Sequence, residues 1–386
     1  MNDPTTRAHT APRTGRRGFL AAAGATAVGA ALAVAGRDSA AARPGRAPGA
    51  AAFRVPVEDV RHTRTWMTWP DSTAIWNGGS LAGVQADIAL IARTVARYEP
   101  VVMCANPASA AKARSQCGTS VTVIDSIPVD DCWTRDTGPV FRTDGTGGLD
   151  AVGLNFNGWG GKQTHAKDAR VAERIAAHVG VPFTRAAFVG EGGAVEQDGA
   201  GTLMATRSSL LNRNRNPGMT QARLEGAMRD AYGASKVIWF EGVYGQDITD
   251  DHVDATSRFL AEGEALVQLP LASDDDAYAE DARRQYRALT AATTAAGRPM
   301  DVLRLQGPDY ARIRSTNPDF LASYANFYLC NGALICAHFG DTRADAAAKS
   351  VLSRLYPDRR IEQLNIDRLG AGGGGIHCVT QQQPVP

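Results

Sequence analysis

The C-terminal region of the chain places a cysteine in an unusual setting. Four consecutive glycines, Gly372 to Gly375, are followed by Ile376, His377 and Cys378. Glycine allows positive φ values and a close approach between backbone and ligand. A cysteine directly after such a loop can be firmly held and still accessible, as a thiol nucleophile must be. The run therefore predicts a nucleophilic Cys378, and the alternative is a flexible tail that contains a cysteine by chance.

Four other short segments are dense in reactive or conformationally special residues. They cover residues 130–139 (DDCWTRDTGP), 155–162 (NFNGWGGK), 190–193 (GEGG) and 247–254 (DITDDHVD). We expect each of them, like the Cys378 loop, to lie between a strand and a helix, where functional sites are usually built. Taken singly, each has a structural explanation, such as Trp133 and Trp159 as core anchors or His252 as a helix cap. Their joint occurrence favours one shared site.

Composition limits the substrates that such a site would handle. The 386 residues carry 41 basic and 40 acidic side chains, for a formal charge of +1. This balance gives no global attraction to nucleic acid or to an anionic membrane. We expect a small substrate, neutral or cationic, that is held by local carboxylates.

The N-terminus has the pattern of a targeting segment. Arg16 and Arg17 precede an Ala/Gly/Val run that reaches Gly36, and small residues follow at 39–42. The pattern resembles a twin-arginine export signal, and the alternative is a retained membrane anchor. We therefore expect a signal peptide over 1–42, a disordered linker over 43–52 and one catalytic domain over 53–386. The twin-arginine translocation machinery would then deliver the protein to the cell envelope or the extracellular space.

The six cysteines do not form a metal-binding pattern. No C-x-x-C pair occurs and the histidines are scattered, which argues against zinc and iron–sulfur sites. An oxidising destination permits disulfides, and Cys104 with Cys117 is one candidate pair. Cys330 and Cys336 are expected to face one side of a single strand as packing residues. Cys132 has no assigned role.

Short apolar runs alternate with amphipathic segments along the rest of the chain. Strands are predicted over 101–105, 121–124, 152–157, 201–205, 237–241, 265–269, 302–305 and 327–337, the last turning at Asn331-Gly332 as a hairpin. Helices are predicted over 81–98, 107–115, 167–179, 221–232, 276–296 and 343–356. The alternation indicates an α/β fold, but periodicity cannot distinguish a doubly wound sheet from a ring of smaller units.

Together the five segments resemble the agmatine deiminase family, which also includes the bacterial, Porphyromonas-type peptidyl-arginine deiminases. The resemblance runs from Trp66 to Gln383 and rests on the strings WTRDTGP, FNGWGGK, EGG, HVD and GGxIHCVTQQ. It implies a pentein-like five-bladed propeller of ββαβ modules with pseudo-fivefold symmetry. It also implies a hydrolase of polyamine metabolism that uses neither a metal nor an organic cofactor.

The resemblance also implies roles for individual residues. Cys378 would be the nucleophile and His252 the general acid and base. Asp136 and Asp254 would grip a guanidinium, with Glu191 a further acid in the site. Trp133, Trp159, Asp251, Gly374 and Gly375 would contribute to substrate binding. His252 and Asp254 are expected to point to the same side of an extended strand.

The implied chemistry is hydrolytic deimination of a guanidinium to a ureido product and ammonia through a covalent thiouronium on Cys378. The chain departs from the family pattern at Ile248, Asp251 and Gly375, where an acidic residue, Gly and Asn are usual. Asp247, Asp250 and Asp251 favour a dicationic substrate such as agmatine, which would give N-carbamoylputrescine. Arg207, Arg213 and Arg215 could instead bind the carboxylate of a peptide's C-terminal arginine.

Three different functions are also compatible with the sequence. A secreted peptidyl-arginine deiminase would fit the export signal. A non-catalytic exported protein would bind guanidinium compounds without needing the thiol, and a cysteine hydrolase of amides would need an oxyanion hole that the sequence does not reveal. The oligomeric state is open, and a homo-oligomer is compatible with the sequence.

Overall fold

The computed structural model describes residues 53–386 of the chain. The signal peptide expected over 1–42 and the linker expected over 43–52 lie outside these residues. Within 53–386, no helix combines the length and the hydrophobicity needed to cross a membrane.

The strands of the described region form five small sheets. One sheet has the order β16 (Gln381–Pro384), β1 (His62–Thr68), β2 (Val101–Cys104) and β3 (Val121–Ile124). The other four sheets each hold three consecutive strands: β4 (Val140–Thr143), β5 (Leu149–Gly153) and β6 (Phe183–Arg185); β7 (Val195–Gln197), β8 (Thr202–Thr206) and β9 (Lys236–Phe240); β10 (Ser257–Ala261), β11 (Glu264–Leu269) and β12 (Asp301–Gln306); β13 (Tyr328–Cys330), β14 (Ala333–Ala337) and β15 (Arg360–Leu364).

One pairing pattern recurs in every sheet. An antiparallel pair of strands is extended by a third strand parallel to the second. Parallel neighbours need a crossover connection, and a longer helix supplies it each time: α1 (Leu81–Val95), α5 (Val171–Val179), α7 (Gln221–Tyr232), α8 (Ala277–Thr290) and α9 (Thr342–Leu355). In the first sheet β16 completes the antiparallel pair, and α2 (Pro107–Cys117) leads to the additional strand β3.

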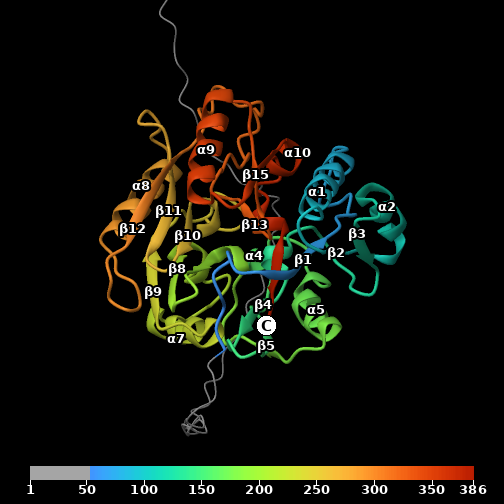
Figure 1. Cartoon of the computed structure of the whole chain (residues 1–386), viewed down its shortest axis with the longest axis horizontal. Coiled ribbons are helices and arrows are strands. Elements are labelled where there is room, and N and C mark those ends of the chain that lie inside the picture. The colour runs from blue at the N-terminus through green and yellow to red at the C-terminus, as the bar shows by residue number, and fades with distance from the viewer. Residues whose placement is uncertain (1–52) are drawn as a thin grey trace, which may run out of the picture.

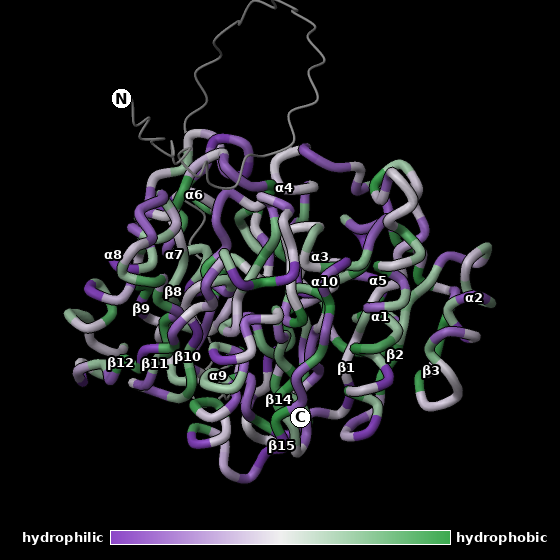
Figure 2. Tube along the Cα trace, turned by 90° about the horizontal axis from the view of Figure 1, so that it is seen from above, coloured by the Kyte–Doolittle hydropathy of each residue, from purple (hydrophilic) through white to green (hydrophobic). Residues whose placement is uncertain are grey.

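The helices cover the outside of the molecule. Figure 1 shows α1, α5, α7, α8 and α9 towards the periphery, with strands such as β1, β4 and β13 nearer the middle. Figure 2 places α8 and β12 at one end and α2 and β3 at the opposite end, in agreement with Figure 1. The short helices α3 (Thr134–Thr137), α4 (Gly158–Gly161), α6 (Arg207–Leu210) and α10 (Asp367–Gly370) lie in the connecting segments. The mixed α/β fold in one domain, expected from the sequence, is confirmed.

The structure confirms the predicted hairpin but differs from two other expectations, the shared strand of Cys330 and Cys336 and the end of the helix predicted over 276–296. The hairpin at Asn331-Gly332 is confirmed, with Gly332 at φ 80° and Cys330 paired with Ala333. Cys330 and Cys336 therefore lie on two paired strands, not on one, although both are packing residues of the core. The helix predicted over 276–296 ends at Thr290, because the chain then turns back and Thr293 pairs with Pro299.

The candidate disulfide between Cys104 and Cys117 is absent. All six cysteines are free. Cys104 packs in the hydrophobic cluster that contains Trp66 and Phe141. Cys117 belongs to a different cluster, with Ile88. The spacing in the sequence gives no sign that these two side chains enter separate cores.

Candidate active site

The glycine loop before Cys378 is shaped by its contacts with other side chains. Only Gly373 of the four glycines has a positive φ, at 84°. A β-carbon at Gly372 would overlap the indole of Trp76, and one at Gly374 would overlap that of Trp133. Gly372 and Gly374 therefore serve a close approach, since they let the backbone lie flat against two indoles. Both Trp76 and Trp133 donate their indole N–H to Asp131, at 2.7 and 2.8 Å.

Cys378 lies on a single 3₁₀ turn, His377–Val379, and is partly exposed. Its sulfur is 3.9 Å from Oδ2 of Asp254 and 3.4 Å from Nδ2 of Asn326. Burial and the nearby carboxylates of Asp254 and Asp136 raise the pKa of the Cys378 thiol well above its usual value. The resting side chain is therefore a thiol. A positive charge placed against the two carboxylates would favour its ionisation.

Asp136 is held at the site by two N–H donors. Its Oδ1 accepts the backbone N–H of Gly193 at 3.0 Å, and its Oδ2 accepts the indole N–H of Trp159 at 3.0 Å. Trp159 has φ 53°, a conformation that non-glycine residues rarely adopt and that often marks functional sites. Burial raises the pKa of Asp136, partly offset by the positive charge of His252.

His252 lies between Asp136 and Glu191. Its Nδ1 is 3.7 Å from Asp136 Oδ2, and its Nε2 is 3.4 Å from Glu191 Oε2. Burial alone would lower the pKa of His252, but the charges of Asp136 and Glu191 together raise it to about 9. His252 is therefore an imidazolium at neutral pH, able to donate a proton.

The relation expected between His252 and Asp254 is wrong in its geometry. Asp254 lies within a 3₁₀ turn, Val253–Ala255, and not on an extended strand. The two side chains nevertheless meet at Gly193. A β-carbon there would lie 2.8 Å from His252 Nδ1 and 3.0 Å from both Asp136 Oδ1 and Asp254 Oδ2. The turn thus brings His252 and Asp254 to the same small space by a different route.

Asp254 carries an unsatisfied oxygen. Its Oδ2 lies 2.7 Å from Nδ1 of His377. Its Oδ1 is buried and has no hydrogen-bond partner among residues 53–386. Buried polar atoms are rarely left unpaired, and a buried carboxylate oxygen without a donor is a natural position for a ligand N–H. Although burial raises the pKa of Asp254, the hydrogen bond and charge of His377 bring it below its usual value.

Glu191 is fixed by a buried arginine. Arg215 Nε lies 3.0 Å from Glu191, Arg215 Nη1 lies 2.5 Å from Asp250, and the Arg215 side chain is fully buried. Lys162 also binds Asp250, at 2.7 Å. Arg215 is therefore a structural partner of Glu191, and the expectation that it could bind a substrate carboxylate is wrong. Arg207 is engaged as well, with Glu241 at 2.8 Å.

The other residues expected to bind substrate, Trp133, Gly374, Gly375 and Asp251, contact neighbouring side chains or backbone of the site. Trp133 is buried against Gly374, with its N–H bound by Asp131. Gly375 lies against the side chain of Asn326. Asp251 is buried in a left-handed conformation, φ 70°, next to His252 in the chain. Segments 130–139, 190–193 and 247–254 each connect two strands, so the prediction that each segment joins a strand to a helix is wrong for these three.

Three residues of the site were missed in the sequence. Asn326 contacts the sulfur of Cys378, His377 binds Asp254, and Glu58 binds His377 from the other side at 2.8 Å. His377 stands next to Cys378, which was an available signal. Asn326 and Glu58 lie in segments without a recognisable motif. Within residues 53–386, no group of three or more His, Cys, Asp or Glu side chains is placed to hold a metal ion.

A family model for Porphyromonas-type peptidyl-arginine deiminases matches residues 54–384. The chain belongs to this family. The match covers nearly the whole described region and includes every residue of the site.

Relatives of this family member carry the name agmatine deiminase. One from Pseudomonas aeruginosa is 35% identical, over 89% of this chain and 98% of the relative. One from Ectopseudomonas mendocina is also 35% identical, over 88% of this chain and 97% of the relative. The solved agmatine deiminase of Enterococcus faecalis superposes with a TM-score of 0.80 at 28% identity, over 86% of this chain and 96% of that one.

Proposed function

We propose that the protein hydrolyses agmatine to N-carbamoylputrescine and ammonia, through a covalent thiouronium on Cys378. The observation that carries the proposal is the unpartnered, buried Oδ1 of Asp254, whose other oxygen lies 3.9 Å from the Cys378 sulfur. The relatives named above support agmatine as the substrate.

Substrate binding would prepare the thiol for attack. A guanidinium is a planar cation with N–H donors that match carboxylates. Asp254 Oδ1 and the carboxylate of Asp136 bind it and fix its plane, which leaves the central carbon open to Cys378. The cation neutralises the two carboxylates that raise the pKa of the thiol. The thiol then loses its proton to solvent, and the thiolate is the nucleophile.

The first half of the reaction releases ammonia. A bond forms between the sulfur and the guanidinium carbon, giving a tetrahedral adduct. Imidazolium His252 donates its proton to the departing nitrogen, the carbon–nitrogen bond breaks and ammonia leaves. The product of this half is a thiouronium on Cys378, with His252 now neutral. Glu191 keeps the imidazole in place through the 3.4 Å contact with Nε2.

The second half uses the neutral His252 as a base. It removes a proton from water, which adds to the thiouronium carbon. The carbon–sulfur bond then breaks and regenerates the thiolate, while the adduct's hydroxyl proton is lost and the carbonyl of the ureido product forms. Ammonia takes up one proton, so the overall change is guanidinium plus water to urea derivative plus ammonium.

Agmatine fits the surroundings better than a peptide's C-terminal arginine. A C-terminal carboxylate needs a cation, but Arg215 and Arg207 are bound to Glu191 and Glu241, which leaves only the exposed Arg213 of the three candidate arginines. The second ammonium of agmatine is compatible with the acidic segment 247–254, although Asp250 in this segment is already bound by Arg215 and Lys162. A peptidyl-arginine deiminase remains the second candidate because the family model carries that name.

Product analysis tests the proposal and separates the candidates. Purified protein is incubated with agmatine, free arginine or an arginyl peptide, and both ammonia and ureido product are measured. We expect the highest kcat/KM with agmatine and no turnover by Cys378→Ser, which should remain folded. A peptide preference would replace agmatine with the second candidate. Binding without turnover by the wild-type protein would contradict catalysis altogether.

We also propose that the five sheets stand as the blades of a ring around the site, and that the protein is exported by the twin-arginine route. The recurring pairing pattern supports the first proposal, and Arg16 with Arg17 supports the second. Exchanging both arginines for lysine should retain the precursor in the cytoplasm, as measured by cell fractionation. Unchanged export of that variant would contradict the route.

A further inference from the structure

His377 connects Asp254 to a second buried cluster of charges. Its Nδ1 lies 2.7 Å from Asp254 Oδ2, and its Nε2 lies 2.8 Å from Glu58 Oε2. Neutral imidazole has a single N–H, so donation to both carboxylates requires hydrogens on both ring nitrogens. The His377 side chain is 2% exposed. A buried imidazole without hydrogen-bond partners would destabilise the folded protein, so both of these contacts matter.

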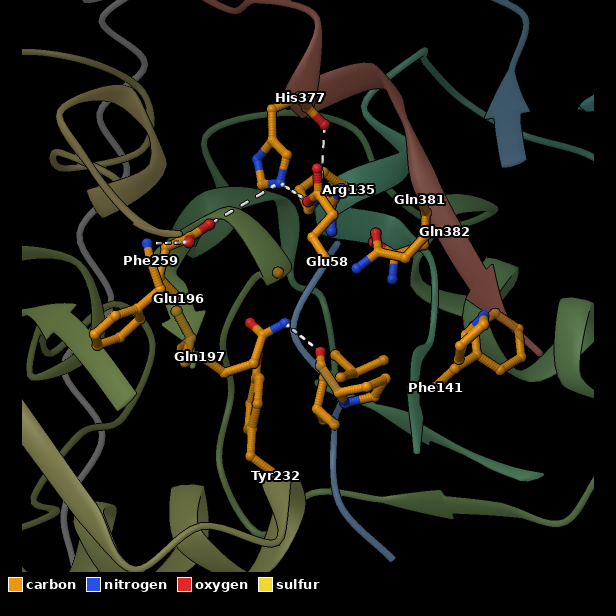
Figure 3. A pocket seen from close by; sticks show the side chains of 16 residues that line it. Glu58, Arg135, Phe141, Glu196, Gln197, Tyr232, Phe259, His377, Gln381 and Gln382 are labelled. Carbon is orange, nitrogen blue, oxygen red and sulfur yellow. Dashed lines mark hydrogen bonds and ion pairs between the residues drawn. The ribbon is translucent and has the colours of Figure 1, made fainter. Parts of the chain in front are cut away.

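Glu58 is itself held firmly. Its carboxylate lies 3.3 Å from Arg135 and 3.1 Å from Arg258, and it accepts the backbone N–H of Leu329 at 2.8 Å. Figure 3 shows the His377 ring directed towards Glu58, with Glu196 beside it, in a pocket that these residues line together with Arg135. The lining of this pocket does not include Cys378, His252 or Asp136. His377 therefore has one face on this pocket and the other on Asp254.

We propose that His377 is a positioning residue for deimination: it holds Oδ2 of Asp254, the oxygen 3.9 Å from the Cys378 sulfur, and leaves Oδ1 for the guanidinium, while Glu58 fixes the imidazole from behind. This inference rests on the proposed function. His377 also follows the glycine loop and precedes Cys378, so its anchoring restrains the backbone that carries the nucleophile.

The charge of His377 would also influence the ionisation of Asp254. Burial raises the pKa of Asp254, and the largest opposing contribution is the His377 hydrogen bond. The other charged or titratable groups around these two side chains are His252, Arg258, Cys378, Asp136, Glu58, Glu196 and Arg135. Loss of His377 would leave His252 and Arg258 as the cations that act on Asp254. We therefore expect Asp254 to become protonated at a higher pH.

Two substitutions separate the contacts of the two ring nitrogens. The amide nitrogen of asparagine is separated from its α-carbon by the same number of bonds as Nδ1 of histidine. The amide nitrogen of glutamine is separated from its α-carbon by the same number of bonds as Nε2 of histidine. His377→Asn can therefore keep a donor for Asp254, whereas His377→Gln can keep one only for Glu58. Removing a hydrogen bond to a buried charge should raise the KM of His377→Gln for agmatine about 10- to 100-fold. The acid limb of its kcat/KM profile should move to higher pH.

His377→Asn should have a KM closer to wild type than His377→Gln. His62→Gln is the matched control, because His62 also pairs a buried imidazole with a glutamate, Glu99, at 3.2 Å but does not contact Asp254. This control should leave the KM and the acid limb unchanged. Melting temperatures show whether each variant is folded.

Four results would overturn the positioning role. The first is an unchanged KM and acid limb in folded His377→Gln, and the second is a larger KM increase in His377→Asn than in His377→Gln. The third is a shift of the acid limb in the His62→Gln control equal to that in His377→Gln. If His377→Gln does not fold, the fourth is an unchanged KM in Glu58→Gln. Absence of wild-type turnover would instead refute the proposed function itself, so the two failures are distinguishable.

Discussion

The α-carbon of Gly193 lies so close to His252 that a β-carbon there would be 2.8 Å from the imidazole Nδ1. Asp136 and Asp254 border the same position at 3.0 Å. A Gly193→Ala substitution must displace at least one of these three side chains. We expect kcat/KM for agmatine to fall by about two orders of magnitude, as ångström-scale misplacement of reacting groups does.

Gly226 provides the control for this substitution. It lies inside α7 with open space around it. Gly226→Ala should keep full activity and stabilise the protein by about 0.5–1 kcal/mol, since alanine is the better helix former. Wild-type activity in folded Gly193→Ala would show that the three side chains are not packed around Gly193 as described.

The buried ion pair of Arg215 with Glu191 predicts a large effect on stability. Both side chains are fully buried. Arg215→Met would leave Glu191 without its arginine and remove one partner of Asp250. Breaking a buried pair in this way costs about 3–5 kcal/mol, which urea unfolding measures. Arg170→Met, which removes an exposed pair with Glu173, should change stability by only about 0.5 kcal/mol. Similar small losses in both variants would contradict the structural role of Arg215.

The pKa of His252 predicts the alkaline limit of activity. Since the pKa is raised to about 9, the imidazolium needed for the first half is present below that pH and is lost as the pH rises through it. The plot of kcat/KM against pH should therefore fall above about pH 9. Both Asp136, whose pKa is raised by burial, and Asp254 must be ionised to bind the cation, so the acid limb should report the two carboxylates together.

Glu191→Gln tests the assignment of that alkaline limb. Removing this negative charge should move the limb to lower pH, since Glu191 is one of the groups that raise the pKa of His252. A profile that stays flat from pH 5 to 9 and beyond would contradict the dual role of His252. If the alkaline limb does not move in Glu191→Gln, that limb reports the ionisation of a group other than His252.

The state of the cysteines predicts a simple chemical result. Six thiols should react with a colorimetric thiol reagent in denaturant without reductant, because all six are free. In the native protein Cys378 should react first, being partly exposed while the other five are buried. Cys378→Ser should remove this first phase. A count of four thiols in denaturant would restore the disulfide that the sequence allowed.

Residues within dense motifs were predictable, whereas their distant partners were not. Cys378, His252, Asp254, Asp136 and Glu191 stand in short strings whose residue types already indicate chemistry. The structure brings these five side chains together. Glu58 and Asn326 are single residues without local signals, and only folding brings them to His377 and Cys378.

Strands with a local hydrophobic pattern were likewise predictable, whereas a strand that depends on a distant partner was not. Strands 101–104 and 121–124 follow apolar runs, and both occur near their predicted bounds. β16 has the sequence QQQP and is buried throughout. Its polarity hides it from any pattern of hydrophobicity, because its place depends on pairing with β1. Likewise, spacing alone could not assign Cys104 and Cys117 to different clusters.

The pairing of β16 with β1 has a consequence for how the protein matures. Trp66 lies opposite Gln381, so the sheet that supports the thiol joins segments from opposite ends of the described region. Contacts so remote in sequence slow folding, because the entropy of closing a long loop must be offset before they form. We expect that a molecule in which β16 is not yet paired with β1 leaves its nucleophile unplaced, and that it is therefore inactive towards guanidinium groups until this sheet is complete.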